Sequence, residues 1–97
     1  MALTPAEIKL KKIASLEKKI AKNVEMIGKY TVKSDAKSAA RIALMTALSV
    51  EIDNTKKIKL QVKIDKAGEM IQKYQTAIVN RTYKNNLLAE EVRILKL

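Results

Sequence analysis

Lysine is the side chain with the clearest chemical role in this 97-residue chain, where 20 Lys and Arg against 10 Asp and Glu give a net charge of +10. Two sets of lysines recur at steps that place each set in a stripe along one side of a helix. The two stripes are Lys12, Lys19, Lys22, Lys29 and Lys33, and Lys56, Lys59, Lys63, Lys66, Lys73 and Lys84. Such stripes predict binding to phosphate groups or to an acidic protein surface. The alternative is a solvated surface whose lysine stems cover the edge of an apolar contact.

If the stripes bind nucleic acid, the contacts are expected to go to the phosphate backbone. The three arginines, which could read guanine, are scattered along the chain. Tyr30 and Tyr74 fall within apolar patterns, which leaves Tyr83 as the one free stacking side chain. We therefore expect binding without sequence specificity, with both lysine stripes facing outward on the same side of an assembly.

Catalytic and metal chemistry find little support in the composition. The chain has no His and no Cys, which removes the usual general base near neutral pH and the usual zinc ligands. Gly28 and Gly68 stand alone, so no glycine-rich phosphate loop is present. Glu90 and Glu91 are adjacent and would point to different sides of a helix. We predict that the protein is not an enzyme and that it has no catalytic residue, cofactor or metal ion.

The sequence carries no signal for membrane insertion or secretion. Residues 1–12 lack the apolar core of a signal peptide. The longest apolar stretch, residues 39–50, contains Arg41 and is shorter than the roughly 20 residues of a spanning helix. A cytoplasmic or virion-associated location is therefore favoured, with no membrane partner.

The placement of proline, glycine and capping residues predicts long helices. Residues 4–7, Thr-Pro-Ala-Glu, are typical of a helix start, and no proline follows them. A first break is expected over residues 28–35, where the glycine suits a helix end and Ser34 or Asp35 suits the next cap. A second, weaker break is expected over residues 53–55, Asp-Asn-Thr.

Two patterns compete in the second half of the chain. Residues 58–65 alternate strictly between apolar and polar types, which is typical of a strand, and residues 50–52 could be its hairpin partner. A longer pattern at steps of four and three favours a helix. This second seam consists of Leu60, Ile64, Ala67, Ile71, Tyr74, Ile78, Arg81, Asn85, Leu88, Val92 and Leu95. Because the seam is much longer than the alternation, we predict a helix.

The first half of the chain shows a similar pattern. Its first seam consists of Ile13, Leu16, Ile20, Asn23, Ile27 and Tyr30. The polar Asn23 either fixes the register of a helix pair or faces water. Residues 36–48 carry many alanines, whose small side chains permit close approach of a neighbouring helix.

An internal repeat connects the two halves. Residues 12–30 and 56–74 agree at ten of nineteen positions at an offset of 44, and both contain Glu-Met-Ile-x-Lys-Tyr. The similarity predicts a duplicated unit of about 44 residues. The expected fold is therefore all-α, with internally duplicated helical hairpins or a coiled-coil-like bundle. Residues 1–97 would form one domain of two repeats, about 5–53 and 54–97, and the second repeat either bends near residues 75–82 or continues as one helix.

The seams also predict a role. A chain of this length in long, thin helices buries little surface alone, so its Ile/Leu seams are expected to bind other copies. We predict a structural or assembly protein that forms a homo-oligomer or part of a virion, filament or scaffold. The alternative is a small basic protein that coats nucleic acid through its lysine stripes.

Overall fold

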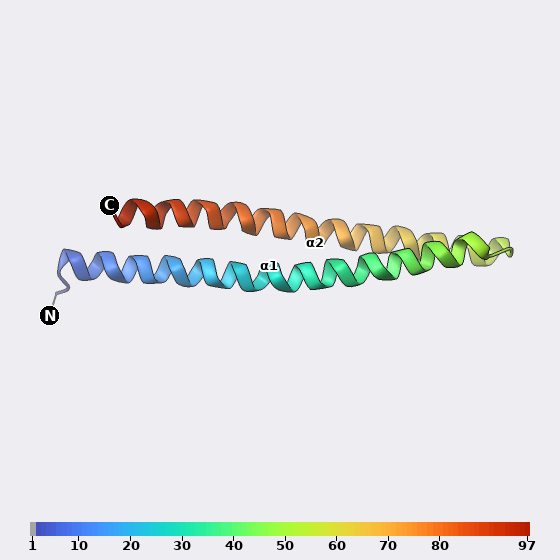
Figure 1. The fold of residues 1–97 in the computed structure, drawn as a ribbon, viewed down its shortest axis with the longest axis horizontal. Helices are drawn as coiled ribbons and strands as arrows, with labels where there is room; N and C mark the ends of the chain where they lie inside the picture. The colour runs from blue at the N-terminus through green and yellow to red at the C-terminus, as the bar shows by residue number, and fades with distance from the viewer. Residues whose placement is uncertain (1) are drawn as a thin grey trace.

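The protein is an extended hairpin of two long antiparallel helices (Figure 1). The computed structural model describes residues 2–97, in which helix α1 spans Pro5–Val50 and helix α2 spans Asn54–Leu95. Both termini lie at the same end, and the whole hairpin measures 75 × 23 × 14 Å. The all-α prediction is confirmed, and residues 58–65 lie within α2 and not in a strand.

The predicted start of α1 is confirmed at Thr4. Its hydroxyl accepts a hydrogen bond from the Glu7 backbone N–H at 3.2 Å and donates one to the Glu7 carboxylate at 3.0 Å. Pro5 occupies the first turn, where its missing N–H costs no helical hydrogen bond. The side-chain cap therefore satisfies one of the free backbone donors at this end.

The break predicted over residues 28–35 is wrong, because α1 continues through this segment. Gly28 lies inside α1 and does not have the positive φ that a glycine at a helix end often adopts. Ser34, expected as a cap, is instead buried with 7% of its surface exposed. One glycine weakens a helix by only about 1 kcal/mol, and the packing of α1 along α2 outweighs this cost.

The second break, predicted over residues 53–55, is confirmed at Asp53, although the turn of the hairpin spans residues 51–53 and Asn54 already lies in α2. Residues 51–53 join the helices, and the Glu51 carboxylate accepts hydrogen bonds from the N–H groups of Ile52 and Asp53, both at 3.1 Å. The Asp53 carboxylate accepts from the Lys56 N–H at 2.9 Å and caps α2. From there α2 continues without interruption to Leu95, so residues 75–82 lie within one helix.

The two helices form a thin core. Leu16, Ile64, Ala67 and Val92 are the apolar side chains classed as buried within the described chain, and each keeps 4–8% of its surface exposed. Two helices alone cannot enclose a side chain from all directions. The hairpin is therefore stabilised by a long row of partly exposed side-chain contacts between α1 and α2, and not by a central cluster of fully buried side chains.

Proline substitution tests the continuity of α1. Val32 lies in the middle of residues 28–35, where the break was predicted, and its side chain is 69% exposed. Val32→Pro should destabilise the hairpin by about 3 kcal/mol or more, because it removes a helical hydrogen bond. The control, Ile52→Pro, lies in the turn after an extended residue and should cost about 1 kcal/mol. Urea unfolding followed by circular dichroism measures both, and equal effects would contradict a continuous helix.

Candidate functional site

The two seams lie against each other within one chain. Every residue of the first seam on α1, and every residue of the second seam on α2, is buried or half-buried. At the middle of the contact the rings of Tyr30 and Tyr74 stack with their centroids 6.2 Å apart. The predicted seam residues thus form the interior of the hairpin, and their contacts are made inside the molecule.

A polar layer interrupts the apolar contact beside the tyrosines. The Asn23 side chain donates a hydrogen bond to the Asn85 side chain at 2.8 Å and accepts one from Arg81 at 3.0 Å. Asn85 in turn donates to the backbone carbonyl of Ile20 at 3.3 Å. The Arg81 guanidinium also lies 5.7 Å from the centroid of the Tyr30 ring, within reach of a cation–π interaction.

This layer connects polar residues that the sequence left without partners. Sliding α1 along α2 by one helical turn would separate Asn23 from both Arg81 and Asn85. Half-buried polar groups would then face apolar side chains. The arrangement therefore favours one alignment of α1 on α2.

The predicted lysine stripes occupy one broad face of the hairpin, here called the lysine face. In α1 and α2 each of the eleven lysines directly precedes a residue that faces the other helix or continues the seam pattern, as Lys19 precedes Ile20 and Lys63 precedes Ile64. Residues in this position share one flank of their helix. Because the helices are antiparallel, the corresponding flanks of α1 and α2 lie on the same side of the pair. The ion pair between Lys12 and Glu91, at 4.0 Å, joins these two flanks across the contact.

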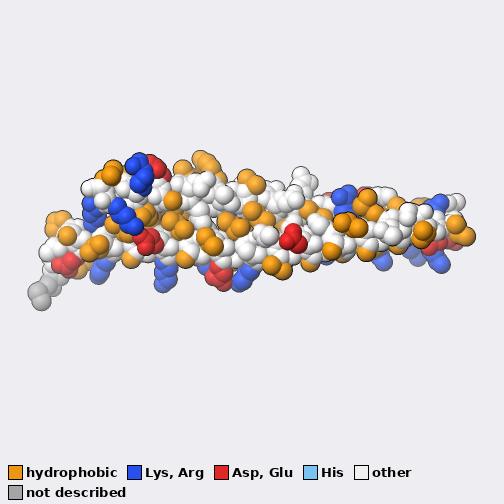
Figure 2. Space-filling view, viewed as in Figure 1, with side chains coloured by type: hydrophobic (Ala, Val, Ile, Leu, Met, Phe, Trp, Pro, Cys, Tyr) orange, Lys and Arg blue, Asp and Glu red, His pale blue; other side chains and the backbone are white. Residues whose placement is uncertain are grey.

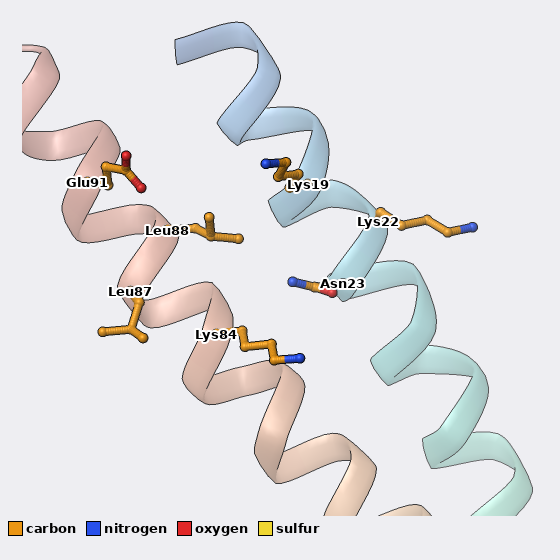
Figure 3. Close-up of a pocket in the computed structure, with 7 residues that line it drawn as sticks. All are labelled: Lys19, Lys22, Asn23, Lys84, Leu87, Leu88 and Glu91. Atoms are coloured by element: carbon orange, nitrogen blue, oxygen red, sulfur yellow. The ribbon is translucent and has the colours of Figure 1, made fainter. Parts of the chain in front are cut away.

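A groove on the lysine face shows how the two helices contribute together (Figure 3). It has a volume of about 420 Å³, and Lys19, Lys22, Asn23, Lys84, Leu87, Leu88 and Glu91 line it. Lys19 and Lys84 extend from opposite helices toward the space between them, whereas Lys22 points away from α2. A second groove, lined by Lys37, Ala40, Leu44, Lys63, Lys66, Ala67 and Met70, lies nearer the turn.

Few carboxylates compensate the lysine face. Glu91 is the one acidic residue that shares the flank of these lysines. Glu25, at the margin, pairs with Lys22 at 3.9 Å and with Lys29 at 3.3 Å. The other eight stripe lysines have no carboxylate within 4.0 Å in residues 2–97. Exposed pairs of this kind are weak, so the face keeps most of its positive charge.

The opposite face consists of residues that follow seam residues, and it differs in chemistry. On α1, small side chains such as Ala14 and Ala21 alternate there with exposed apolar ones, whereas the α2 part of the face is mostly polar and includes Gln61, Asp65 and Gln72. The large apolar side chains exposed on this face are Leu10, Val24, Ile42, Met45 and Val79. Near the open end, Glu17 and Lys96 form an ion pair across the helices at 3.1 Å. This side faces the viewer in Figure 2, where hydrophobic side chains lie along both helices.

Titration and metal binding give no further site in the described chain. The hydrogen bonds from Arg93 lower the pKa of the exposed Glu90 carboxyl and raise the pKa of the Arg93 guanidinium. No cluster of acidic residues in residues 2–97 is suited to a metal ion. Neither α1 nor α2, over this same range, has a stretch long and apolar enough to cross a membrane.

Comparison with known protein families, curated proteins and solved structures found no match to this chain.

Removing the polar layer tests its role in aligning the helices. Asn23→Ala leaves Asn85 and Arg81 half-buried without their partner and should destabilise the hairpin by about 1–3 kcal/mol. The matched control is Asn80→Ala, at an exposed position of α2, which should change stability by less than about 0.5 kcal/mol. Urea unfolding compares the two variants. Equal losses would show that the polar layer does not stabilise this alignment.

Proposed function

We propose that this protein is a non-enzymatic structural subunit that self-associates through its opposite face. The observation that carries the proposal is the division of the surface. The seams are occupied within the chain, while Val24, Ile42 and Met45 on the opposite face remain 50–64% exposed. Exposed apolar side chains that gather on one face are typical of an interaction surface.

A second copy of the same chain is the occupant that the dimensions and charges favour. With extents of 75 and 23 Å, the face offers on the order of 1,700 Å², about twice the ~800 Å² that each partner buries in a stable interface. The guanidinium of Arg41 lies beside Gly68 on this face, and Arg93 and Lys96 add two basic residues near the C-terminus. Because these charges are far fewer than the eleven stripe lysines, two copies meet less repulsion here than they would through the lysine face.

The predicted repeat implies that the two helices of the hairpin are related by two-fold symmetry. At the offset of 44, Tyr30 corresponds to Tyr74, and these two residues contact each other. A local two-fold axis through the tyrosines would relate α1 to α2 and place corresponding residues on the same face. We infer that the hairpin is a duplicated unit of about 44 residues, and the stacking of two corresponding tyrosines supports this.

The grooves support the same inference. Lys19, Lys22 and Leu88 line the first groove, and the residues 44 positions away from them, Lys63, Lys66 and Leu44, line the second. Corresponding sequence positions therefore contribute to corresponding surface features. Such a subunit would join others through the opposite face and leave its lysine faces on the outside of a virion, filament or scaffold.

Introducing charge on the opposite face tests self-association. The double variant Val24→Lys, Ile42→Lys should be monomeric where the original protein is a dimer or larger, because it buries two unpaired charges in the interface. The control variant, Val32→Lys, Val62→Lys, adds the same charge at exposed positions at the edges of the hairpin and should keep the oligomer. Light scattering at about 100 μM and at two salt concentrations measures the mass.

Because the proposed contact is apolar, the oligomer should persist in 1 M salt. Circular dichroism checks that both variants keep their helices. A well-folded monomer of the original protein at this concentration would refute the proposal, as would equal dissociation of the two double variants.

A further inference from the structure

We propose that the lysine face binds double-stranded nucleic acid, with the duplex lying lengthwise along the hairpin. The lysine face is the side of the molecule that self-association through the opposite face would leave exposed, and duplex binding does not require self-association.

The charge of the lysine face is that of a phosphate-binding surface. Eleven lysines share the face with one carboxylate, Glu91, and eight of them lack an ion pair in the described chain. On duplex DNA, each lysine that neutralises a phosphate releases a condensed counterion and strengthens binding at low salt. A face with so little internal compensation leaves most of its lysines available for such contacts.

The two helices extend the lysine face in opposite directions from the tyrosine contact. Lys12 lies 18 residues before Tyr30, and Lys56 lies 18 residues before Tyr74. At about 1.5 Å per residue, each helix carries lysines for roughly 27 Å from the tyrosines. The antiparallel arrangement therefore gives a continuous lysine face roughly 54 Å long, which corresponds to about 16 base pairs of B-form duplex.

The symmetry of the face also fits a duplex. Lys12, Lys19, Lys22 and Lys29 have counterparts 44 positions later, at Lys56, Lys63, Lys66 and Lys73. Each pair lies at equal distances on either side of the Tyr30–Tyr74 contact. The two antiparallel strands of a duplex are likewise related by two-fold axes across the helix. A two-fold protein surface can therefore make the same contacts to both strands.

A duplex is favoured over a single strand because the lysine face offers no aromatic platform. Tyr30 and Tyr74 pack against each other inside the hairpin, whereas surfaces for single strands stack bases on exposed aromatic rings. Tyr83, which is 63% exposed, does not lie on the flank of the stripe lysines. The contacts available are those to phosphates, which bind without reading the bases.

Fluorescence anisotropy with labelled 24-base-pair DNA tests the proposal, with duplex RNA, single-stranded DNA and anionic lipid vesicles as the other probes. The double variant Lys19→Gln, Lys63→Gln removes corresponding lysines from the two grooves. It should bind duplex DNA about tenfold more weakly at 100 mM salt, and its log–log salt slope should fall by about 2. The control, Lys11→Gln, Lys18→Gln, loses the same charge from the outer edge of α1 and should weaken binding less than threefold.

The length of the duplex gives a second test. A duplex of 8 base pairs covers half of the lysine face and should bind at least tenfold more weakly than one of 24. Comparable affinity for DNA and RNA duplexes would show that the phosphate backbone is the feature recognised. The proposal is overturned by no duplex binding at 50 mM salt, by equal weakening of the two double variants, or by tighter binding to single strands or vesicles.

Discussion

The antiparallel contact between the two seams is the constraint on which the rest of the molecule depends. The turn at residues 51–53 brings α2 back along α1, and the stacked pair Tyr30 and Tyr74 lies at the middle of the contact. The hydrogen bonds that join Asn23 to Arg81 and Asn85 favour one alignment. Once this alignment is set, the residues that directly precede seam residues lie on one broad face, and the residues that directly follow seam residues lie on the other. The lysine face and the opposite face are therefore both consequences of a single packing arrangement.

A hairpin of this shape has limited stability of its own, because its core is one row of side chains that all keep some exposure. Association through the opposite face would add a second apolar layer and leave the lysines in water. Binding of a polyanion on the lysine face would in turn reduce the repulsion among the eleven lysines. The two proposed interactions use different sides of the hairpin and favour the same folded state.

The sequence predicted the helices, the turn and the seam residues because each depends on local composition or on a sustained period. It failed at residues 28–35, where Gly28 and Ser34 resembled a helix end although packing on α2 holds the segment helical. From the sequence we expected the Ile/Leu seams to bind other copies, whereas in the hairpin they pack against each other within the chain. The period alone does not distinguish the two arrangements, because both bury the same side chains. The partners of Asn23 could have been found: with the turn centred on Ile52, residues such as Asn23 and Arg81 lie equally far from it along the chain.

The distance between Lys19 and Lys63 within one molecule tests most directly whether the seams close inside the chain. The protein has no Cys, so nitroxide labels can be attached at K19C and K63C alone and measured by pulsed electron resonance after dilution with unlabelled protein. The closed hairpin predicts a separation of roughly 33 Å, from 22 residues of helical rise along the axis. An opened chain that pairs its seams with other copies would place the labels roughly 66 Å apart, and that result would contradict the account.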